Sequence, residues 1–177
     1  MEIKLWKMSV YDLAKLGEKF DVVIFMGVLY HQRHPLHALD LIHGHVARDL
    51  LVFQSMQPGA NGAVQLADGY EFRETEIFEQ PDFPKMLFVE KRHANDPTNW
   101  WIPNRACSGA MRWSAGFEIA TYPEEAVFVC RRKPLPEGPR AIYAEEFAEL
   151  CAWMTRRCAP TSSPNLQTEK LAVPQPA

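Results

Sequence analysis

Three histidines with a regular spacing are the first candidates for chemistry in this chain. His31, His34 and His37 form a His-x-x-His-x-x-His pattern directly after a long apolar run. A metal site would need these imidazoles to converge with further ligands, but His37 follows Pro35 into a predicted helix, and no cysteine or carboxylate completes the set. Because an imidazole titrates near neutral pH, we expect His31 to act as a general base instead. The alternative for His31 is a hydrogen bond within its own loop.

Aromatic and basic side chains are further candidates for contacts with a substrate. The ring and phenol of Tyr30 would stabilise a neighbouring cation, and Trp100 and Trp101 can stack on a planar group such as a nucleobase. Arg33 and Arg105 are candidate contacts for an anionic substrate. For each aromatic residue the alternative is a packing role in the protein interior.

The segment from residue 20 to residue 55 predicts the strand, loop, helix and strand that would position these groups. The run from Phe20 to Met26 is almost continuously apolar, which is typical of a strand covered on both faces. Gly27 ends this strand, and Pro35 begins a helix whose apolar stripe repeats every three or four residues. A second buried strand follows from Leu50. Ligands of open parallel sheets bind at the carboxyl ends of the strands, so we expect a site between residues 27 and 34.

The rest of the chain predicts a few more elements. We expect a short strand at residues 3–10, a long connection at residues 57–102 that contains a strand at 85–90, and a helix with Asn104 as its N-cap and Gly116 after its end. A strand pair joined through Tyr122-Pro123 follows. Residues 140–157 predict an amphipathic helix, and residues 159–177 a disordered tail.

Several sequence strings are those of one enzyme superfamily. Met26-Gly-Val-Leu-Tyr-His31, Asn99-Trp-Trp-Ile-Pro103, Ala115-Gly-Phe117 and AVFVCRRKP together resemble the carboxyl-terminal part of a class I S-adenosylmethionine-dependent methyltransferase. The match is closer still to the bacterial tRNA wobble-uridine carboxymethyltransferase and its methyltransferase relatives, over about residues 3–134. The resemblance implies an α/β fold, a partial Rossmann-like sheet with an antiparallel strand pair at its carboxyl end. It also implies methyl transfer from S-adenosyl-L-methionine to an acceptor, either a small molecule or tRNA.

The resemblance also assigns roles to individual residues. It places the cofactor against Val10, Tyr11, Asp12, Met26, Gly27 and Tyr30. In this assignment Val10 and Tyr11 contact adenine, Asp12 holds the adenine amino group, and Tyr30 lies near the sulfonium. His31 remains the candidate general base, with Arg33, Trp100 and Trp101 as substrate contacts.

Two departures from the family pattern limit the assignment. Glu125 occupies the position at which the carboxymethyltransferase has a basic residue for the extra carboxylate of its cofactor, which favours a plain methyl donor because two carboxylates repel each other. The chain also has no Gly-x-Gly turn, so the first βαβ unit is predicted to be missing. The strand at residues 20–26 would then be an open edge. We expect a truncated chain, unless residues 3–10 pair there or another polypeptide supplies the amino-terminal half.

Composition sets the remaining expectations. A chain of 177 residues, 47% hydrophobic, can form one globular domain, predicted at residues 1–134, and the net charge of −3 argues against tRNA as a partner. Four cysteines without a Cys-x-x-Cys pair predict reduced thiols. No apolar run has the length of a signal peptide core or a membrane span, so we expect a cytoplasmic protein without membrane contact.

Overall fold

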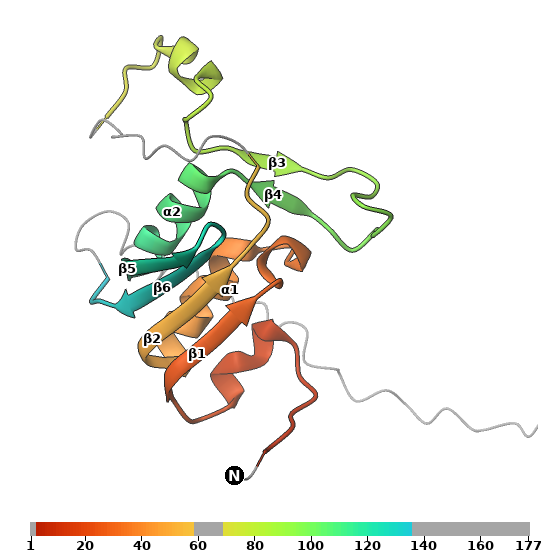
Figure 1. Cartoon of the computed structure of the whole chain (residues 1–177), viewed down its shortest axis with the longest axis vertical. Helices are drawn as coiled ribbons and strands as arrows, with labels where there is room; N and C mark the ends of the chain where they lie inside the picture. Colours follow the sequence, from red (N-terminus) through yellow and green to blue (C-terminus); the bar gives the residue numbers. More distant parts are fainter. Residues whose placement is uncertain (1–2, 59–68, 136–177) are drawn as a thin grey trace, which may run out of the picture. The chain divides into compact units, whose positions relative to one another are not determined.

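A mixed sheet of four strands, in the order β1-β2-β6-β5, is the centre of the molecule (Figure 1). The strands are β1 (Phe20–Met26), β2 (Ala47–Gln54), β6 (Val127–Arg132) and β5 (Phe117–Glu124). β1 and β2 are parallel, whereas β6 is antiparallel to both of its neighbours. These elements come from a computed structural model that describes residues 3–58 and 69–135. The α/β fold class is as predicted: a partial Rossmann-like sheet with an antiparallel pair after the parallel strands.

The crossover between β1 and β2 contains the predicted helix in a modified form. Residues Leu29–His31 form the 3-10 turn η2, Pro35–Leu41 form α1 with the proline in its first turn, and Ile42–Val46 form a π-helical turn, η3. Ala38, Leu39 and Ile42 are fully buried. The apolar stripe predicts the buried face of this connection in part: Leu39, Ile42 and Val46 are buried, whereas Leu36, the first residue of the stripe, has an exposed fraction of 41%. The helical geometry also changes after Leu41.

The second helix, α2 (Arg105–Ser114), precedes β5 and has both of its predicted end signals. The Asn104 side chain accepts a hydrogen bond of 2.9 Å from the amide of Cys107, and Gly116 has a φ of +80°. One cluster of buried residues joins the two helices to the sheet. It includes Leu39 of α1, Met111 of α2, and Leu51, Phe53 and Phe128 of the strands.

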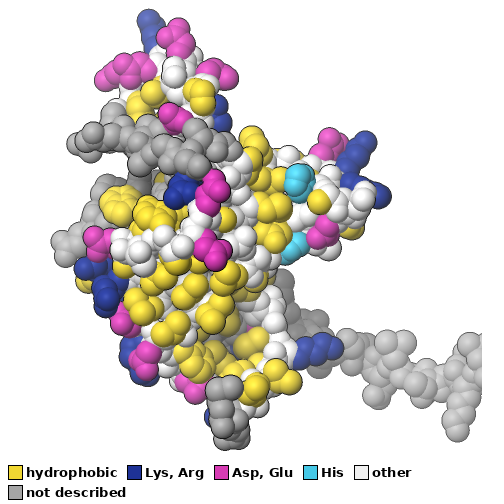
Figure 2. Space-filling model, in the orientation of Figure 1, with side chains coloured by type: hydrophobic (Ala, Val, Ile, Leu, Met, Phe, Trp, Pro, Cys, Tyr) yellow, Lys and Arg dark blue, Asp and Glu magenta, His cyan; other side chains and the backbone are white. Residues whose placement is uncertain are grey.

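The opposite face of the sheet is apolar and open. Val22, Ile24 and Met26 of β1 have exposed fractions of 51%, 71% and 43%. Ile24 lies opposite Val52 of β2, which in turn lies opposite Val129 of β6, so the apolar row crosses three strands. Figure 2 shows hydrophobic side chains gathered over β1 and β2 on this face. No described residue pairs with the outer edge of β1.

The described part of the chain contains further elements. They are the 3-10 helices η1 (Val10–Lys15) and η4 (Thr75–Glu79), and a two-stranded sheet of β3 (Met86–Phe88) and β4 (Trp101–Pro103). The strand predicted at 85–90 is thus confirmed in shorter form. No described helix has the length and apolar character needed to cross a membrane.

Two local predictions were wrong. Residues 3–9 form no strand, because an alternating pattern makes a strand only where a neighbour offers hydrogen bonds, and here Leu5 and Trp6 are exposed. Tyr122 and Pro123 lie inside β5 rather than in the turn, which follows Glu124. The predicted helix at 140–157 and the tail at 159–177 lie outside the described residues.

Candidate functional site

The carboxyl end of β1 brings three of the predicted residues together. Met26 ends the strand, and Gly27 has a φ of +71° and donates its amide to the Gln54 carbonyl at 3.1 Å. A Cβ atom on Gly27 would lie 3.4 Å from the Tyr30 hydroxyl oxygen. A positive φ disfavours side chains at this position, so glycine allows the turn. Met26, Gly27 and Tyr30 therefore form one surface at the strand end.

The β3–β4 hairpin carries the two tryptophans to this surface. The Trp100 amide donates to the Tyr30 carbonyl at 2.8 Å, and the Trp101 indole donates to the Arg33 carbonyl at 3.1 Å. The Arg33 guanidinium lies 4.9 Å from the centre of the Trp100 ring, a cation–π distance. The structure thus brings together Tyr30, Arg33, Trp100 and Trp101, which are far apart in the sequence.

His31 joins the same group through a hydrogen-bonded chain to the hairpin. Its Nδ1 atom lies 2.9 Å from the Thr98 hydroxyl oxygen, and that hydroxyl donates to the Asp96 carboxylate at 2.6 Å. The pKa of Asp96 is lowered, chiefly by the hydrogen bond from the Thr98 side chain. The His31 ring also lies 4.4 Å from the Tyr30 ring. Sequence reasoning missed Asp96 and Thr98, because no motif marks a contact between segments 67 residues apart.

Tyr11 lies at the start of α1, and Val10 and Asp12 are its neighbours in η1 (Val10–Lys15). The Tyr11 hydroxyl accepts a hydrogen bond of 2.9 Å from the His34 amide, and the Tyr11 ring stacks on His37 with centroids 6.0 Å apart. Val10 packs against the core. Asp12 forms an ion pair with Lys15, which lowers the pKa of its carboxyl group. Tyr11 thus contacts the loop that contains His34, which follows Tyr30 and His31 in the chain.

Two arginines lie at the sheet rather than in the loop. Arg105 donates to the Glu125 carbonyl and lies over the rings of Tyr122 and Phe128, so this candidate anion contact belongs to the β5–β6 pair. Arg112 is fully buried, 3.6 Å from the centre of the Phe128 ring, and its guanidinium has no hydrogen bond among the described residues. Burial lowers the pKa of Arg112 to about 10.

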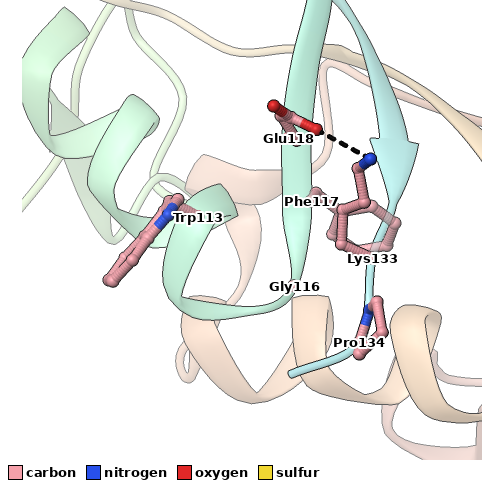
Figure 3. Close-up of a pocket in the computed structure, with 6 residues that line it drawn as sticks. All are labelled: Trp113, Gly116, Phe117, Glu118, Lys133 and Pro134. Carbon is pink, nitrogen blue, oxygen red and sulfur yellow. Dashed lines mark ion pairs between the residues drawn. The ribbon is translucent and has the colours of Figure 1, made fainter. Parts of the chain in front are cut away.

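A hollow of about 220 Å³ lies at the other end of the sheet. Figure 3 shows Gly116 and Phe117 at the start of β5 beside Lys133, whose ammonium is 3.1 Å from the Glu118 carboxylate. Phe117 pairs with Arg132, and β6 runs antiparallel to β2, so the hollow lies near the amino ends of the parallel strands. It is distinct from the Tyr30 surface. No three His, Cys, Asp or Glu side chains of the described segments are grouped as metal ligands.

Comparison with known proteins found a relative that is similar in sequence. The chain is 29% identical over 117 residues to the tRNA U34 carboxymethyltransferase of Desulfotalea psychrophila, a match that covers 66% of this chain and 30% of that protein. The chain therefore spans about a third of the length of this relative. No protein-family model matches.

Solved structures also match this chain, among them two of one protein. They are crystal structures of the N-terminal domain of EvdMO1, one with SAH and one with SAH and D-fucose. Both are 21% identical to this chain, and each match covers 69% of this chain. The matches cover 50% of the chain with SAH and 51% of the chain with SAH and D-fucose. Their TM-scores of 0.42 and 0.41 are too low to support a conclusion about the site. The sequence relative, in contrast, supports the resemblance that the motifs predict, because the chain is similar in sequence to a tRNA U34 carboxymethyltransferase.

Proposed function

We propose that this chain is part of an enzyme that transfers a methyl group from S-adenosyl-L-methionine. The observation that supports this most strongly is the surface formed by Met26, Gly27 and Tyr30 at the carboxyl end of β1. This is the place where open α/β sheets bind ligands. The printed name of the sequence relative supports the same reaction class. The unpaired buried thiols of Cys107 and Cys130 support the proposed cytoplasmic location.

The residues at this surface suit a sulfonium donor. S-adenosylmethionine supplies an electrophilic methyl group on a positively charged sulfur. The half-buried Tyr30 offers an aromatic face and a hydroxyl group, both favourable beside a cation, and Met26 offers an exposed apolar side chain. Val10, Tyr11 and Asp12 would bind the adenine, next to α1. Gly27 would allow the turn that places Tyr30 beside the end of β1.

The remaining residues of the group would act on the acceptor. As the nucleophilic atom of the acceptor bonds to the methyl carbon, the carbon–sulfur bond breaks and its electron pair stays on sulfur. The acceptor then loses a proton, which His31 would take up. Arg33, held over Trp100 at 4.9 Å, would contact an anionic part of the acceptor, and Trp100 and Trp101 would stack on a planar part.

The proposal also concerns which donor and which acceptor the reaction uses. A tRNA substrate is favoured by the name of the relative, although the net charge of −3 offers little electrostatic attraction for nucleic acid. A plain methyl donor is favoured over a carboxymethyl donor because Glu125 takes the place of a basic residue. Filter binding with tRNA at low salt would distinguish a tRNA acceptor from a small molecule.

A second candidate function is docking of another polypeptide. It is favoured by the open edge of β1 and by the exposure of Val22, Ile24 and Met26. An amino-terminal half with the glycine-rich turn, supplied by another polypeptide, would cover this edge and complete the cofactor site. A monodisperse monomer in light scattering, unchanged by such a partner, would contradict this candidate.

Isothermal titration with S-adenosylmethionine tests the main proposal. We expect weak but saturable binding, in the millimolar range, because only part of the cofactor site lies on this chain. Tyr30→Ala should abolish the binding heat. Tyr122→Ala, which removes a tyrosine with an exposed fraction of 52% on β5, should leave the heat unchanged. The proposal is wrong if Tyr30→Ala and the unmodified chain bind equally, or if neither binds.

A further inference from the structure

The turn of the β3–β4 hairpin holds Asp96 in a fixed position. The His93 and Asp96 backbones exchange two hydrogen bonds, of 3.2 Å and 2.9 Å, around Ala94 and Asn95. Both of these central residues have positive φ, at 50° and 63°, as in a type I′ hairpin turn. A non-glycine residue such as Ala94 adopts this conformation at a cost, so surrounding contacts must maintain it. Asn99 contributes, because its side-chain amide donates to the carbonyls of His93 and Asp96 at 3.2 Å and 3.3 Å.

The Asp96 carboxylate determines where the Thr98 hydroxyl proton lies. The same carboxylate oxygen accepts the Thr98 amide at 2.8 Å and the Thr98 hydroxyl at 2.6 Å. These hydrogen bonds lower the pKa of Asp96, so the group is ionised near neutral pH. An ionised carboxylate accepts hydrogen bonds and cannot donate one. The Thr98 hydroxyl must therefore donate to Asp96.

The direction of that hydrogen bond fixes the next one. The Thr98 hydroxyl donates its single proton in the hydrogen bond to Asp96, so its oxygen can only accept a hydrogen bond from His31. The Nδ1 atom of His31 lies 2.9 Å from that oxygen. For a hydrogen bond to form, Nδ1 must carry the proton. The Thr98 carbonyl oxygen, 3.4 Å from the same nitrogen, also favours a proton there. Neutral His31 then has an unprotonated Nε2, and no described residue forms a hydrogen bond with that atom.

We propose that Thr98 and Asp96 are positioning residues that hold neutral His31 as its Nδ1–H tautomer, with Nε2 as the proton-accepting atom. The inference deepens the proposed function, since it names the atom of His31 that would take the acceptor's proton. It is also a statement about the free chain, independent of any cofactor. The second oxygen of Asp96, 4.0 Å from Nδ1, would stabilise the imidazolium formed after proton transfer.

Nitrogen NMR of the histidine side chains tests the proposal. Spectra of the full chain recorded at about pH 8, above the usual pKa of histidine, distinguish protonated from unprotonated ring nitrogens. We expect a protonated Nδ1 and an unprotonated Nε2 for His31, the reverse of the tautomer that an unconstrained histidine favours. His31→Gln identifies the resonances by their loss. An Nε2–H tautomer in the unmodified chain would overturn the proposal, whatever the outcome of the cofactor titration.

Two substitutions of Thr98 separate positioning from packing. Thr98→Val keeps the shape but removes the hydroxyl, so the His31 resonances should shift toward the Nε2–H tautomer. Thr98→Ser keeps the hydroxyl and should retain the Nδ1–H tautomer. If Thr98→Val leaves the tautomer unchanged, Thr98 has no positioning role. If Thr98→Val fails to fold, the spectrum of the unmodified chain and that of Thr98→Ser still decide the question.

Discussion

The two faces of the main sheet both carry apolar side chains but differ in what covers them. On one face α1 and α2 bury Phe25, Leu51, Phe53 and Phe128 almost completely. On the other, Ile24 retains an exposed fraction of 71%, although it lies in the same strand as Phe25. Strands with apolar side chains on both faces are typical of sheets that are covered twice. The sequence of β1 is thus that of a two-sided strand, of which the described residues cover one side.

The two ends of the sheet also differ. At the carboxyl end of β1, a glycine turn, a tyrosine and a hairpin place several polar and aromatic groups together. At the other end, the hollow beside Gly116 has one ion pair, between Lys133 and Glu118. Chemistry is therefore expected at the first end, and stability effects are expected at the second.

Removing a large side chain from the covered face should have the largest effect. Phe53→Ala deletes a fully buried ring, so we expect the free energy of unfolding to fall by about 3–5 kcal/mol. Ile24→Ala on the open face should lower it by less than about 1 kcal/mol. Urea denaturation measures both values. Equal losses would mean that the open face is buried in solution.

Gly116 tests the packing between η3 and the strand pair. A Cβ atom there would lie 2.6 Å from the His43 Nε2 atom, and the φ of +80° is unfavourable for alanine. We expect Gly116→Ala to lower the free energy of unfolding by about 2–4 kcal/mol, from backbone strain and overpacking together.

Gly17→Ala is the matched control for Gly116→Ala. Gly17 has a φ of +75° with no atom within 4 Å of the Cβ position, so only the backbone cost of about 1 kcal/mol should remain. Thermal or urea unfolding of both variants gives the comparison. A loss for Gly116→Ala no greater than that for Gly17→Ala would argue against the close contact with His43.

Arg112 is a charged residue buried within the covered face. Its guanidinium is buried without a hydrogen bond among the described residues, which is costly for a charge. Arg112→Met should raise the free energy of unfolding by about 1–3 kcal/mol, because methionine has a similar shape and no charge to desolvate. A strong loss of stability in urea denaturation would show that the contact with Phe128 outweighs the desolvation cost.

The smallest expected effect is the pH dependence caused by His43. Burial lowers the pKa of this imidazole below its usual value of 6.5, so the unfolded chain binds more protons below that pH. The contribution of neutral His43 to stability is therefore complete well above pH 6.5 and is lost progressively as the pH falls below that value.

His43→Gln isolates this contribution. Glutamine can still donate to the Lys133 carbonyl, which His43 contacts at 2.7 Å, but it does not titrate. The difference in free energy of unfolding between the two proteins, measured across this pH range, cancels the other titrating groups. We expect the unmodified chain to lose stability relative to His43→Gln on acidification, and a constant difference would contradict the assigned burial.

Local signals in the sequence predicted much of the fold. The apolar run to Met26, the proline at the start of α1, the Asn104 cap and the positive φ of Gly116 each depend on neighbours in the chain, so they can be read from the sequence. The strand predicted at residues 3–10 depended on a pairing partner that the described part of the chain does not offer. Periodicity alone does not reveal such a partner.

The candidate site was predictable only in part, for the same reason. Tyr30 and His31 follow the end of a strand, and this position marks them in the sequence. Asp96 and Thr98 reach His31 only because the hairpin folds back over the loop, and no spacing in the sequence encodes that contact. Arg112 is a charged residue on a buried helix face, which hydrophobic patterning assigns to the surface.

The most direct test of the proposed cofactor site is to identify the residues whose signals change when the cofactor binds. Amide NMR spectra of the labelled chain, recorded during a titration with S-adenosylhomocysteine, report which residues are affected. We predict the largest shifts at Gly27, Tyr30 and His31, with little change at Gly116 and Lys133 beside the hollow. Shifts confined to that hollow, or no shifts at all, would contradict the assignment of the cofactor to the carboxyl end of β1.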